Sequence, residues 1–390
     1  MSPRTSTPAL LTLALGYFTL GTVSLSVVGL ITPIGTDLRV APGQVGLLVT
    51  VFALTFAVVA PLAPAALNRM SRKRTLIVGL VLLTAGAALC ATASGYAVLV
   101  AGRVIAALGA AVFGPAASAA GSLIVPPERR QQALATVFGG MTAATVLGVP
   151  LSTLLGDAFG WRPALLGGAV LAGLALVLVL LLVPALPAAE HPSLAAYREV
   201  LATPGAFATV GTTLLMMAAQ FVVYGLAGAY LAQRFDASAA LVSAALLANG
   251  IAGIVGNTAA PRIAQRLGPA RTVATGLAGL AVAWAALLVA PATTVVILVL
   301  LALWGFANTL YHAPQQGRLV TLLPEHRALI LALNASALYL GMSLGSLLGS
   351  TLLPAVGATW LPAFSLAVLA VAGVTHAVSA RRATTPLPTR

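Results

Sequence analysis

Side chains that can titrate or act as nucleophiles are few in this sequence. It contains seven acids, four histidines and one cysteine among 390 residues. The acids stand beside the ends of apolar segments, Asp37, Asp157 and Asp236 at one end and Glu128, Glu190, Glu199 and Glu325 at the other. Intramembrane catalysis needs clustered acids, nucleophiles or metal ligands. We therefore predict no catalytic residue, no metal site and no cofactor, and an enzyme is only a remote alternative.

The densest group of polar side chains lies in one apolar segment. Asn308, Tyr311, His312 and Gln315 have the spacing of one side of a helix. Such a stripe avoids lipid, so we predict a solute-binding role, with structural glue between helices as the alternative. His312 is also a candidate coupling group, because imidazole changes charge near neutral pH.

Arg103 is the basic residue that stays inside an apolar segment. A guanidinium there is costly unless it faces a bundle interior or water. We predict that it lines a central cavity and is a second coupling candidate; the alternative is snorkelling toward the membrane surface. Further candidate cavity residues, each intramembrane and polar, are Tyr17, Ser24, Gln220, Tyr224, Asn249, Asn334 and Tyr339.

The composition places these side chains in a membrane protein. The chain is 60% hydrophobic and 7% charged, whereas soluble domains carry about a quarter charged residues. Apolar stretches near the ~20 residues that cross hydrocarbon recur throughout. We predict twelve helices, at 9–34, 43–67, 75–94, 96–124, 131–155, 161–184, 205–231, 238–265, 270–290, 294–321, 327–351 and 357–380.

The charged residues give the topology. With a cytoplasmic amino terminus, the loops place sixteen of the 20 Lys and Arg residues inside, so the positive-inside rule predicts both termini in the cytoplasm. The net charge of +13 thus reflects topology, and we predict no nucleic-acid partner. Membrane lipid is the expected surroundings, in a bacterial-type plasma (inner) membrane.

The second half of the sequence repeats the first at a constant offset of 197 residues. Pro64 falls on Pro261, and Gly148 falls on Gly345. The charged loops also match, with Asn68, Arg69, Arg74, Glu128 and Arg130 on Gln265, Arg266, Arg271, Glu325 and Arg327. We predict a six-helix bundle at 1–184, a cytoplasmic linker at 185–204 and a second bundle with a short basic tail at 205–390, an arrangement typical of transporters whose halves rock about a midplane site.

Several local motifs carry a family resemblance. Residues 64–74 are similar to a G-x-x-x-D-R-x-G-R-R loop, with Pro64, Asn68 and Ser71 at the first Gly, the Asp and the second Gly. Arg103 and Gly109 are similar to an R-x-x-x-G-x-G pattern, with Ala107 at its first Gly, and Gly160-Trp161-Arg162 matches a G-W-R corner. The chain resembles, over nearly its whole length, the drug and sugar efflux branch of the major facilitator superfamily (arabinose efflux permease-like, chloramphenicol-resistance-like).

The resemblance implies the major facilitator fold, an all-α integral membrane protein with 12 transmembrane helices in two pseudo-symmetric six-helix bundles. In the family the loop helps to latch the halves. Gating or conformational roles are therefore expected for Asn68, Arg69, Arg72, Arg74, Gln265 and Arg266. They are also expected for Gly148 and Pro150, which resemble the helix-five antiporter motif and share a helix with small residues at every fourth position.

One departure from the family concerns coupling. Efflux relatives carry T-E-F in helix one, where this chain has Thr22-Val23-Ser24, and serine cannot carry a proton. Without a buried anion a lipophilic cation is poorly stabilised. We predict a monomeric secondary transporter that exports a small neutral or anionic drug, sugar or metabolite by alternating access, with protons as a candidate coupling ion. The alternative is a facilitator or importer without proton coupling.

Overall fold

The computed structural model describes residues 3–67, 70–186, 198–200, 202–203 and 205–383. Every regular element in these ranges is a helix. Among the described residues, twelve segments are long and apolar enough to cross a membrane, which confirms the predicted number of spans. Helices are the form such stretches take because hydrocarbon offers the backbone no hydrogen-bond partner.

The first half contains seven α-helices and two short helical turns. They are α1 (Pro3–Leu38), α2 (Pro42–Ala66), α3 (Arg72–Ala91), α4 (Tyr96–Leu123), the 3-10 turn η1 (Pro127–Arg129), α5 (Arg130–Ala143), the π-helix η2 (Ala144–Gly148), α6 (Val149–Phe159) and α7 (Trp161–Leu182). Local sequence explains the starts: Pro42 suits a first helical position, and the Ser71 hydroxyl caps α3 by accepting from the Arg74 amide.

The described part of the second half is again helical. Its elements are α9 (Ala206–Tyr224), α10 (Ala227–Phe235), α11 (Ala239–Leu267), α12 (Pro269–Val289), α13 (Thr294–Thr309), α14 (His312–Leu322), α15 (Arg327–Val356), the 3-10 turn η3 (Ala358–Trp360) and α16 (Leu361–Ala383). The predicted linker at 185–204 falls largely on residues 187–197, 201 and 204, which lie outside the described residues.

Three helices predicted as continuous are interrupted, and in each case the sequence contains the cause. Pro150 and Pro314 lack the amide that would bond the carbonyl four residues earlier. Pro150 directly follows the π-helix η2, and Pro314 directly follows the break between α13 and α14. The predicted helix at 205–231 breaks at Gly225, where a Cβ would press on Ser346 of α15. The interruptions lie in spans five, seven and ten.

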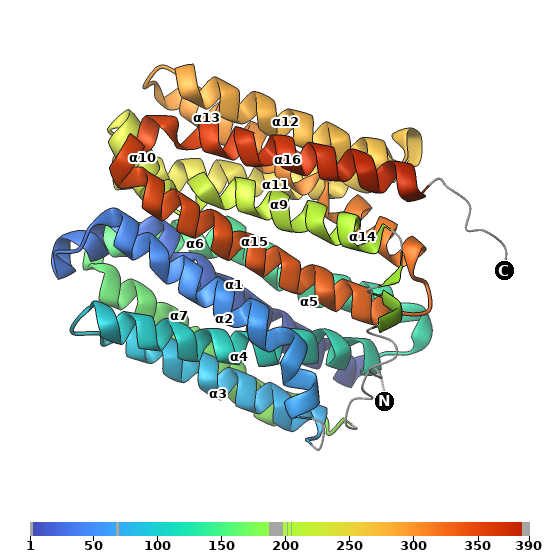
Figure 1. Ribbon diagram of the computed structural model, residues 1–390. Helices are drawn as coiled ribbons and strands as arrows, with labels where there is room; N and C mark the ends of the chain where they lie inside the picture. Colours follow the sequence, from blue (N-terminus) through green and yellow to red (C-terminus); the bar gives the residue numbers. More distant parts are fainter. Residues whose placement is uncertain (1–2, 68–69, 187–197, 201, 204, 384–390) are drawn as a thin grey trace. The chain divides into compact units, whose positions relative to one another are not determined.

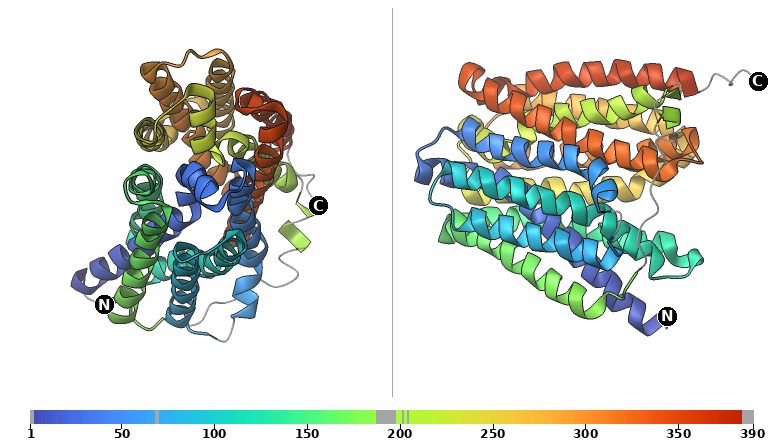
Figure 2. Two further views of the ribbon diagram at one scale, coloured as in Figure 1. Left: turned by 90° about the vertical axis from the view of Figure 1, so that its left-hand side faces the viewer. Right: turned by 60° about the horizontal axis from the view of Figure 1, so that its bottom comes forward.

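The chain divides into two compact units. One consists of Met1–His191 with Leu226–Ala232 and Ala237–Leu247, and the other of Pro192–Gly225, Gln233–Asp236 and Ala248–Arg390. In each unit the long helices run side by side (Figures 1 and 2). In the first, α3 contacts α4 and α7 while α1 contacts α5 and α7; in the second, α12 contacts α13 and α16 while α9 contacts α15 and α16.

These contacts repeat the same pairs of spans, as the offset of 197 residues predicts. The backbone repeats as well. Among non-glycine residues, a positive φ occurs at Arg39 (55°) and at Asp236 (51°), which are equivalent under the offset. Gly160 (89°) and Gly357 (76°) form a second equivalent pair at the turns that precede α7 and η3. The internal repeat is therefore structural as well as a pattern in the sequence.

Candidate functional site

Arg103 lies inside the first unit with its guanidinium on backbone carbonyls. It is 2% exposed. Its Nε donates to Leu48 O (3.1 Å), Nη1 to Val23 O (2.5 Å) and Nη2 to Ser24 O (2.7 Å), and its charge lies 4.3 Å from the centre of the Phe52 ring. The snorkelling alternative does not describe this side chain, which ties α4 to α1 and α2.

A small cavity lies beside this arginine, within the first unit. Its polar lining consists of Thr22, Ser26, Cys90 and Arg103, contributed by α1, α3 and α4. The remaining lining is apolar, with Ala164 and other residues of α7 among it. Cys90 is buried and its thiol lies 3.6 Å from Leu99 O. Most of the guanidinium is thus surrounded by protein groups.

Tyr17 and Ser24, the two helix-one candidates, also find partners inside the first unit. The Tyr17 hydroxyl lies 2.8 Å from Gly114 O and 2.6 Å from Ser118 Oγ. Ser24 donates to Gly21 O at 3.0 Å. Both hydroxyls thus donate to backbone carbonyls of their own unit.

The fifth span, which consists of α5, η2 and α6, approaches α1 closely at two glycines. A Cβ on Gly140 would overlap the Ala14 carbonyl oxygen, and one on Gly148 would overlap the Thr22 hydroxyl. Gly148 ends the π-helix η2, and Pro150 follows in α6. The small residues predicted on one face of this helix therefore allow close contact with α1.

In the second unit, a series of side-chain contacts joins α9 to span ten. Tyr224 and Trp304 meet edge to face with centroids 5.9 Å apart. The Tyr311 hydroxyl donates to Met217 Sδ at 3.0 Å. Gln315 Nε2 donates to Thr209 O at 2.6 Å and to Thr213 Oγ1 at 3.4 Å. Part of the predicted polar stripe is therefore structural glue between helices.

The other predicted amides differ in their partners. Asn249 Nδ2 donates to Leu301 O at 2.9 Å and joins α11 to α13. In contrast, Gln220 Oε1, Asn308 Oδ1 and Asn334 Oδ1 are buried with no hydrogen-bond partner among the described residues. Tyr339 is 9% exposed on α15.

His312 lies at the break in span ten. It is the first residue of α14 and stacks on Tyr311, with ring centroids 4.1 Å apart and planes inclined by 30°. Tyr311 itself is 1% exposed. Because the break precedes it, His312 does not continue the helix of Asn308, which is a correction to the continuous stripe expected from spacing.

Arg318 and His376 form an internal polar network in the second unit. Arg318 Nη1 lies 3.0 Å from Gln315 Oε1 and 3.0 Å from His376 Nδ1, and Nη2 donates to Ser379 Oγ at 2.7 Å. His376 Nε2 lies 3.0 Å from Ala270 O. Since arginine only donates, this arrangement uses His376 with Nδ1 as acceptor and Nε2–H as donor. The network fastens α14 to α16 and α12.

The predicted gating loops are only partly described. Asn68 and Arg69 lie outside the described residues. Arg72 begins α3, and the Arg74 amide takes part in its cap. Gln265 and Arg266 are exposed near the end of α11. The latch role of these residues stays a prediction.

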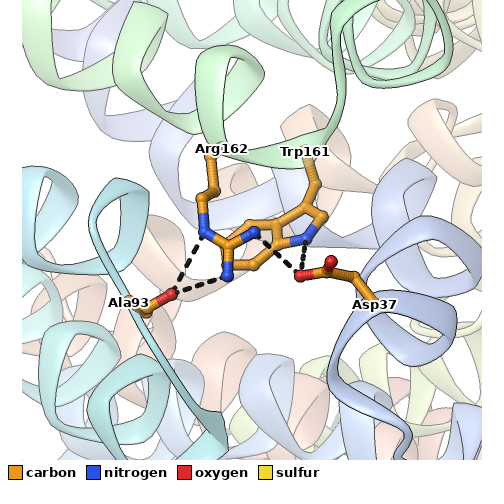
Figure 3. Close-up of polar contacts among 4 residues, drawn as sticks. All are labelled: Asp37, Ala93, Trp161 and Arg162. Carbon is orange, nitrogen blue, oxygen red and sulfur yellow. Dashed lines mark hydrogen bonds and ion pairs between the residues drawn. The ribbon is translucent and has the colours of Figure 1, made fainter.

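The Gly-Trp-Arg corner forms a polar cluster at one end of the first unit (Figure 3). Arg162 Nη1 pairs with Asp37 Oδ2 at 2.8 Å, and Trp161 Nε1 donates to the same oxygen at 3.1 Å. Arg162 Nε and Nη2 donate to Ala93 O at 3.2 and 3.0 Å. The cluster joins the end of α1, the start of α7 and the loop after α3.

The second unit caps the equivalent carbonyl from a different helix. Ala290, the equivalent of Ala93, accepts from Arg234 Nη2 at 3.2 Å. Arg234 lies on α10, at the end of span seven, and is equivalent to Asp37 under the offset of 197 residues. In the first unit the donor is Arg162 of α7, in span six. Both units thus have an arginine that donates to this carbonyl, but the two arginines belong to spans that are not equivalent.

Sequence reasoning missed a second close helix contact. A Cβ on Gly341, Gly345 or Gly349 of α15 would overlap the carbonyl oxygen of Leu214, Ala218 or Val222 of α9. The signal was available, because glycines at every fourth position in an apolar helix predict close packing. This contact is the repeat equivalent of that between helix five and helix one.

A twelve-span helical protein built as two repeats, with polar side chains inside each unit, belongs to the class of polytopic membrane transporters. A model of the Major Facilitator Superfamily matches residues 13–209 and 208–389. The chain therefore belongs to the major facilitator superfamily, and it is a multi-pass membrane transporter rather than an enzyme.

Relatives cover nearly the whole chain. The inner membrane transport protein YdhP of Escherichia coli (strain K12) is 29% identical over 374 residues, 96% of each chain. The probable sugar efflux transporter of Mannheimia succiniciproducens is 27% identical over 345 residues, 88% of this chain and 87% of that protein. A bacterial homologue of the human lysosomal transporter Spinster, inward-facing and unoccupied, shares the fold with a TM-score of 0.79 at 16% identity, covering 100% of both chains.

Proposed function

We propose that this protein is a secondary transporter of a bacterial-type inner membrane that exports a small neutral compound by alternating access. Membership of the major facilitator superfamily supports the general function, which is transport across a membrane. The inner-membrane location and the outward direction are supported by relatives named as an inner membrane transport protein and a probable sugar efflux transporter.

The close contact between helix five and helix one carries the proposal of export. Gly140 meets the backbone of α1 at Ala14 and Gly148 meets the Thr22 side chain, on the helix that resembles the antiporter motif of efflux proteins. Small residues let two helices approach and shift against each other. A π-turn within that helix adds a place where its register can change.

A neutral substrate is favoured over a charged one. Arg103, the cation predicted to line a cavity, already donates to three carbonyls, and Arg318 of span ten is held by Gln315, His376 and Ser379. A cation would need a buried acid, and the acids of the described spans, Asp37 and Asp157, stand near the ends of theirs. Removing a charged solute from water without an opposite partner is costly.

Coupling separates two candidate functions. His312 lies at the break of span ten and carries an imidazole, a group that can take up and release a proton, which makes it the proposed proton-linked group. The lack of an acid in the middle of any described span favours the second candidate, a facilitator of the same solute without proton coupling.

Reconstituted vesicles test both candidates with radiolabelled chloramphenicol and L-arabinose. Accumulation driven by an imposed pH gradient, and lost in His312→Gln, is the result expected of coupled export. Counterflow exchange that ignores the gradient would establish the facilitator instead. Vesicles that neither accumulate nor exchange either compound would contradict the proposed transport of small neutral compounds.

A further inference from the structure

His376 is a buried histidine whose two ring nitrogens both have partners. The residue is 6% exposed. Its Nδ1 lies 3.0 Å from Arg318 Nη1, and its Nε2 lies 3.0 Å from Ala270 O. Arginine only donates hydrogen bonds and a carbonyl only accepts them. These two contacts therefore require a neutral ring, with Nδ1 as the acceptor and the proton on Nε2.

The contact of Arg318 with His376 links the inner half of span ten to span twelve. Arg318 belongs to α14, which packs against α9, α12 and α15, and it reaches α16 with its long side chain. Besides His376, it bonds Ser379 of α16, whose Oγ accepts from Nη2 at 2.7 Å. Since α14 begins after the break that ends α13, the two halves of span ten are not one continuous rod. The Arg318 network thus fixes the inner half at its far side.

The charged groups near His376 are basic. The helices that pack against α16 are α9, α12 and α15, and neither these three nor α14, α16 and the turn η3 contain an acid. Their charged residues are Arg271, Arg318, Arg327, Arg381 and Arg382, and their other titratable residues are Tyr224, His312 and Tyr339. Among the described loops on this side of the unit, Glu199 pairs with His326 at 2.9 Å and Glu325 is exposed.

A second proton on His376 is incompatible with this arrangement. Protonated imidazole donates from both nitrogens, so Nδ1–H would face an N–H group of Arg318. Two positive charges would then lie one hydrogen-bond length apart, and like charges at that distance repel each other strongly in a medium of low dielectric constant. Ala270 O keeps its donor in either state, whereas Arg318 loses an acceptor on α16.

The first unit joins the equivalent helices by a different kind of contact. Under the offset of 197 residues, the positions of Arg318 and His376 are taken by Gly121 and Val179, which have no polar side chain. There, Lys73 Nζ at the start of α3 donates to Leu180 O near the end of α7 at 2.9 Å. That contact contains no imidazole, the side chain that changes charge between about pH 5 and 8. The sensitivity to protons therefore belongs to the second unit.

We propose that His376 is a proton-binding site that senses the pH on the inner side of the membrane: while its ring is neutral, Arg318 fastens α14 to α16, and when the ring is protonated, α14 is released. The inner side is the cytoplasm in the topology that the loop charges predict. Release of α14 also moves His312 and Gln315, which belong to the same helix. The inference goes beyond the proposed export, because it concerns the pH on one side and neither a substrate nor a gradient.

Thermal unfolding of the full-length protein in detergent, followed by tryptophan fluorescence, is the first test. Histidine in an unfolded chain takes up a proton below about pH 6.5, and the folded network excludes that proton. The melting temperature should therefore fall as the pH is lowered from about 8 to about 5.5. We expect His376→Gln to lose at least half of this fall, because its amide accepts from Arg318 and donates to Ala270 O without titrating.

Ser379→Ala is the matched control. It removes another partner of Arg318 on α16 but keeps the imidazole. We expect this variant to melt lower than wild type at every pH and to retain the whole fall on acidification. Loss of the fall in Ser379→Ala as well would assign the pH dependence to the packing of α16 in general and would contradict the proposal.

A distance measurement tests the release of α14 itself. In a Cys90→Ala background, spin labels at Gln316→Cys of α14 and Ala377→Cys of α16 occupy exposed positions. We expect a narrow distribution of distances near pH 8 and a broader, longer one near pH 5.5, where imidazole is protonated. Addition of His376→Gln should keep the narrow distribution at both pH values. Neither measurement needs a substrate, so failure here leaves the proposed transport to the vesicle experiments.

Three results would overturn the proton-binding site. The first is a fall in melting temperature that is as large in His376→Gln as in wild type. The second is a distance distribution of the labelled pair that is the same at both pH values, which decides the matter even where His376→Gln does not fold. The third is a change of distance on acidification that persists in His376→Gln, since that would assign the response to another group.

Discussion

Arg103 and Gln220 are both buried polar residues in apolar helices, but among the described residues only Arg103 has a hydrogen-bond partner for its side chain. The guanidinium of Arg103 meets three carbonyls of α1 and α2, whereas the amide oxygen of Gln220 meets no described partner. A buried polar group that is bonded contributes to stability, and one that is not has a cost unless a ligand or water restores the bond. At the residue scale, the first is thus suited to holding a bundle together, and the second leaves a place where a water or a ligand would restore the bond.

Replacing Arg103 should therefore reduce stability. Hydrogen bonds that involve a charged group contribute about 1.5–3 kcal/mol each, so we expect Arg103→Ala to lower the free energy of unfolding by roughly 3 kcal/mol or more. Thermal unfolding in detergent, followed by tryptophan fluorescence, measures this. Arg39→Ala, which removes an exposed arginine, serves as the control and should melt like wild type. Normal melting of Arg103→Ala with lost transport would instead support a role in binding.

At the scale of elements, the repeat is clearest in two equivalent helix contacts, that of span one with span five and that of span seven with span eleven. Helix five lies on helix one, and α15 lies on α9, each through glycines that leave no space for a side chain. Only the first of these seams contains a π-turn, next to Pro150. The two units therefore share this helix contact, but the helix of span five is irregular at η2 whereas α15 is not. We expect span five to change its register against α1.

A methyl group added between α9 and α15 in the second unit should disturb the packing of these two helices. A Cβ on Gly345 would overlap the carbonyl oxygen of Ala218, and overpacking typically costs about 1–3 kcal/mol. We expect Gly345→Ala to melt lower and to transport more slowly in vesicles. The control is Gly317→Ala in α14, where a Cβ meets no atom within 4 Å and helix propensity favours alanine by about 1 kcal/mol. A Gly345→Ala protein as stable as Gly317→Ala would argue against a tight seam.

At the scale of the whole molecule, the distribution of charge predicts the orientation in the membrane. Sixteen of the 20 Lys and Arg residues fall on one side, and Arg39, Arg162 and Arg234 fall on the other. Asp37 pairs with Arg162, so part of the positive charge on that side is compensated. Orientation follows from the positive-inside rule and remains a prediction until labelled.

Cysteine labelling tests this orientation. In a Cys90→Ala background, we expect an impermeant maleimide added to intact cells to label Ser94→Cys and to spare Glu325→Cys, since both positions are exposed but belong to opposite ends of the spans. Lysed cells should allow labelling of both. Labelling of Glu325→Cys alone in intact cells would invert the predicted topology.

The sequence by itself determined the number of spans, the internal repeat and the family, because hydropathy and loop charge are local properties that survive in any window of about twenty residues. It also contained the causes of the helix breaks at Pro150, Gly225 and Pro314. Only the tertiary structure decided which polar residues have partners. Arg103 bonds residues 55 to 80 positions away, and Gln315 bonds one 106 positions away. Such bonds depend on which helices meet and in what register, and no periodicity within a single helix specifies that.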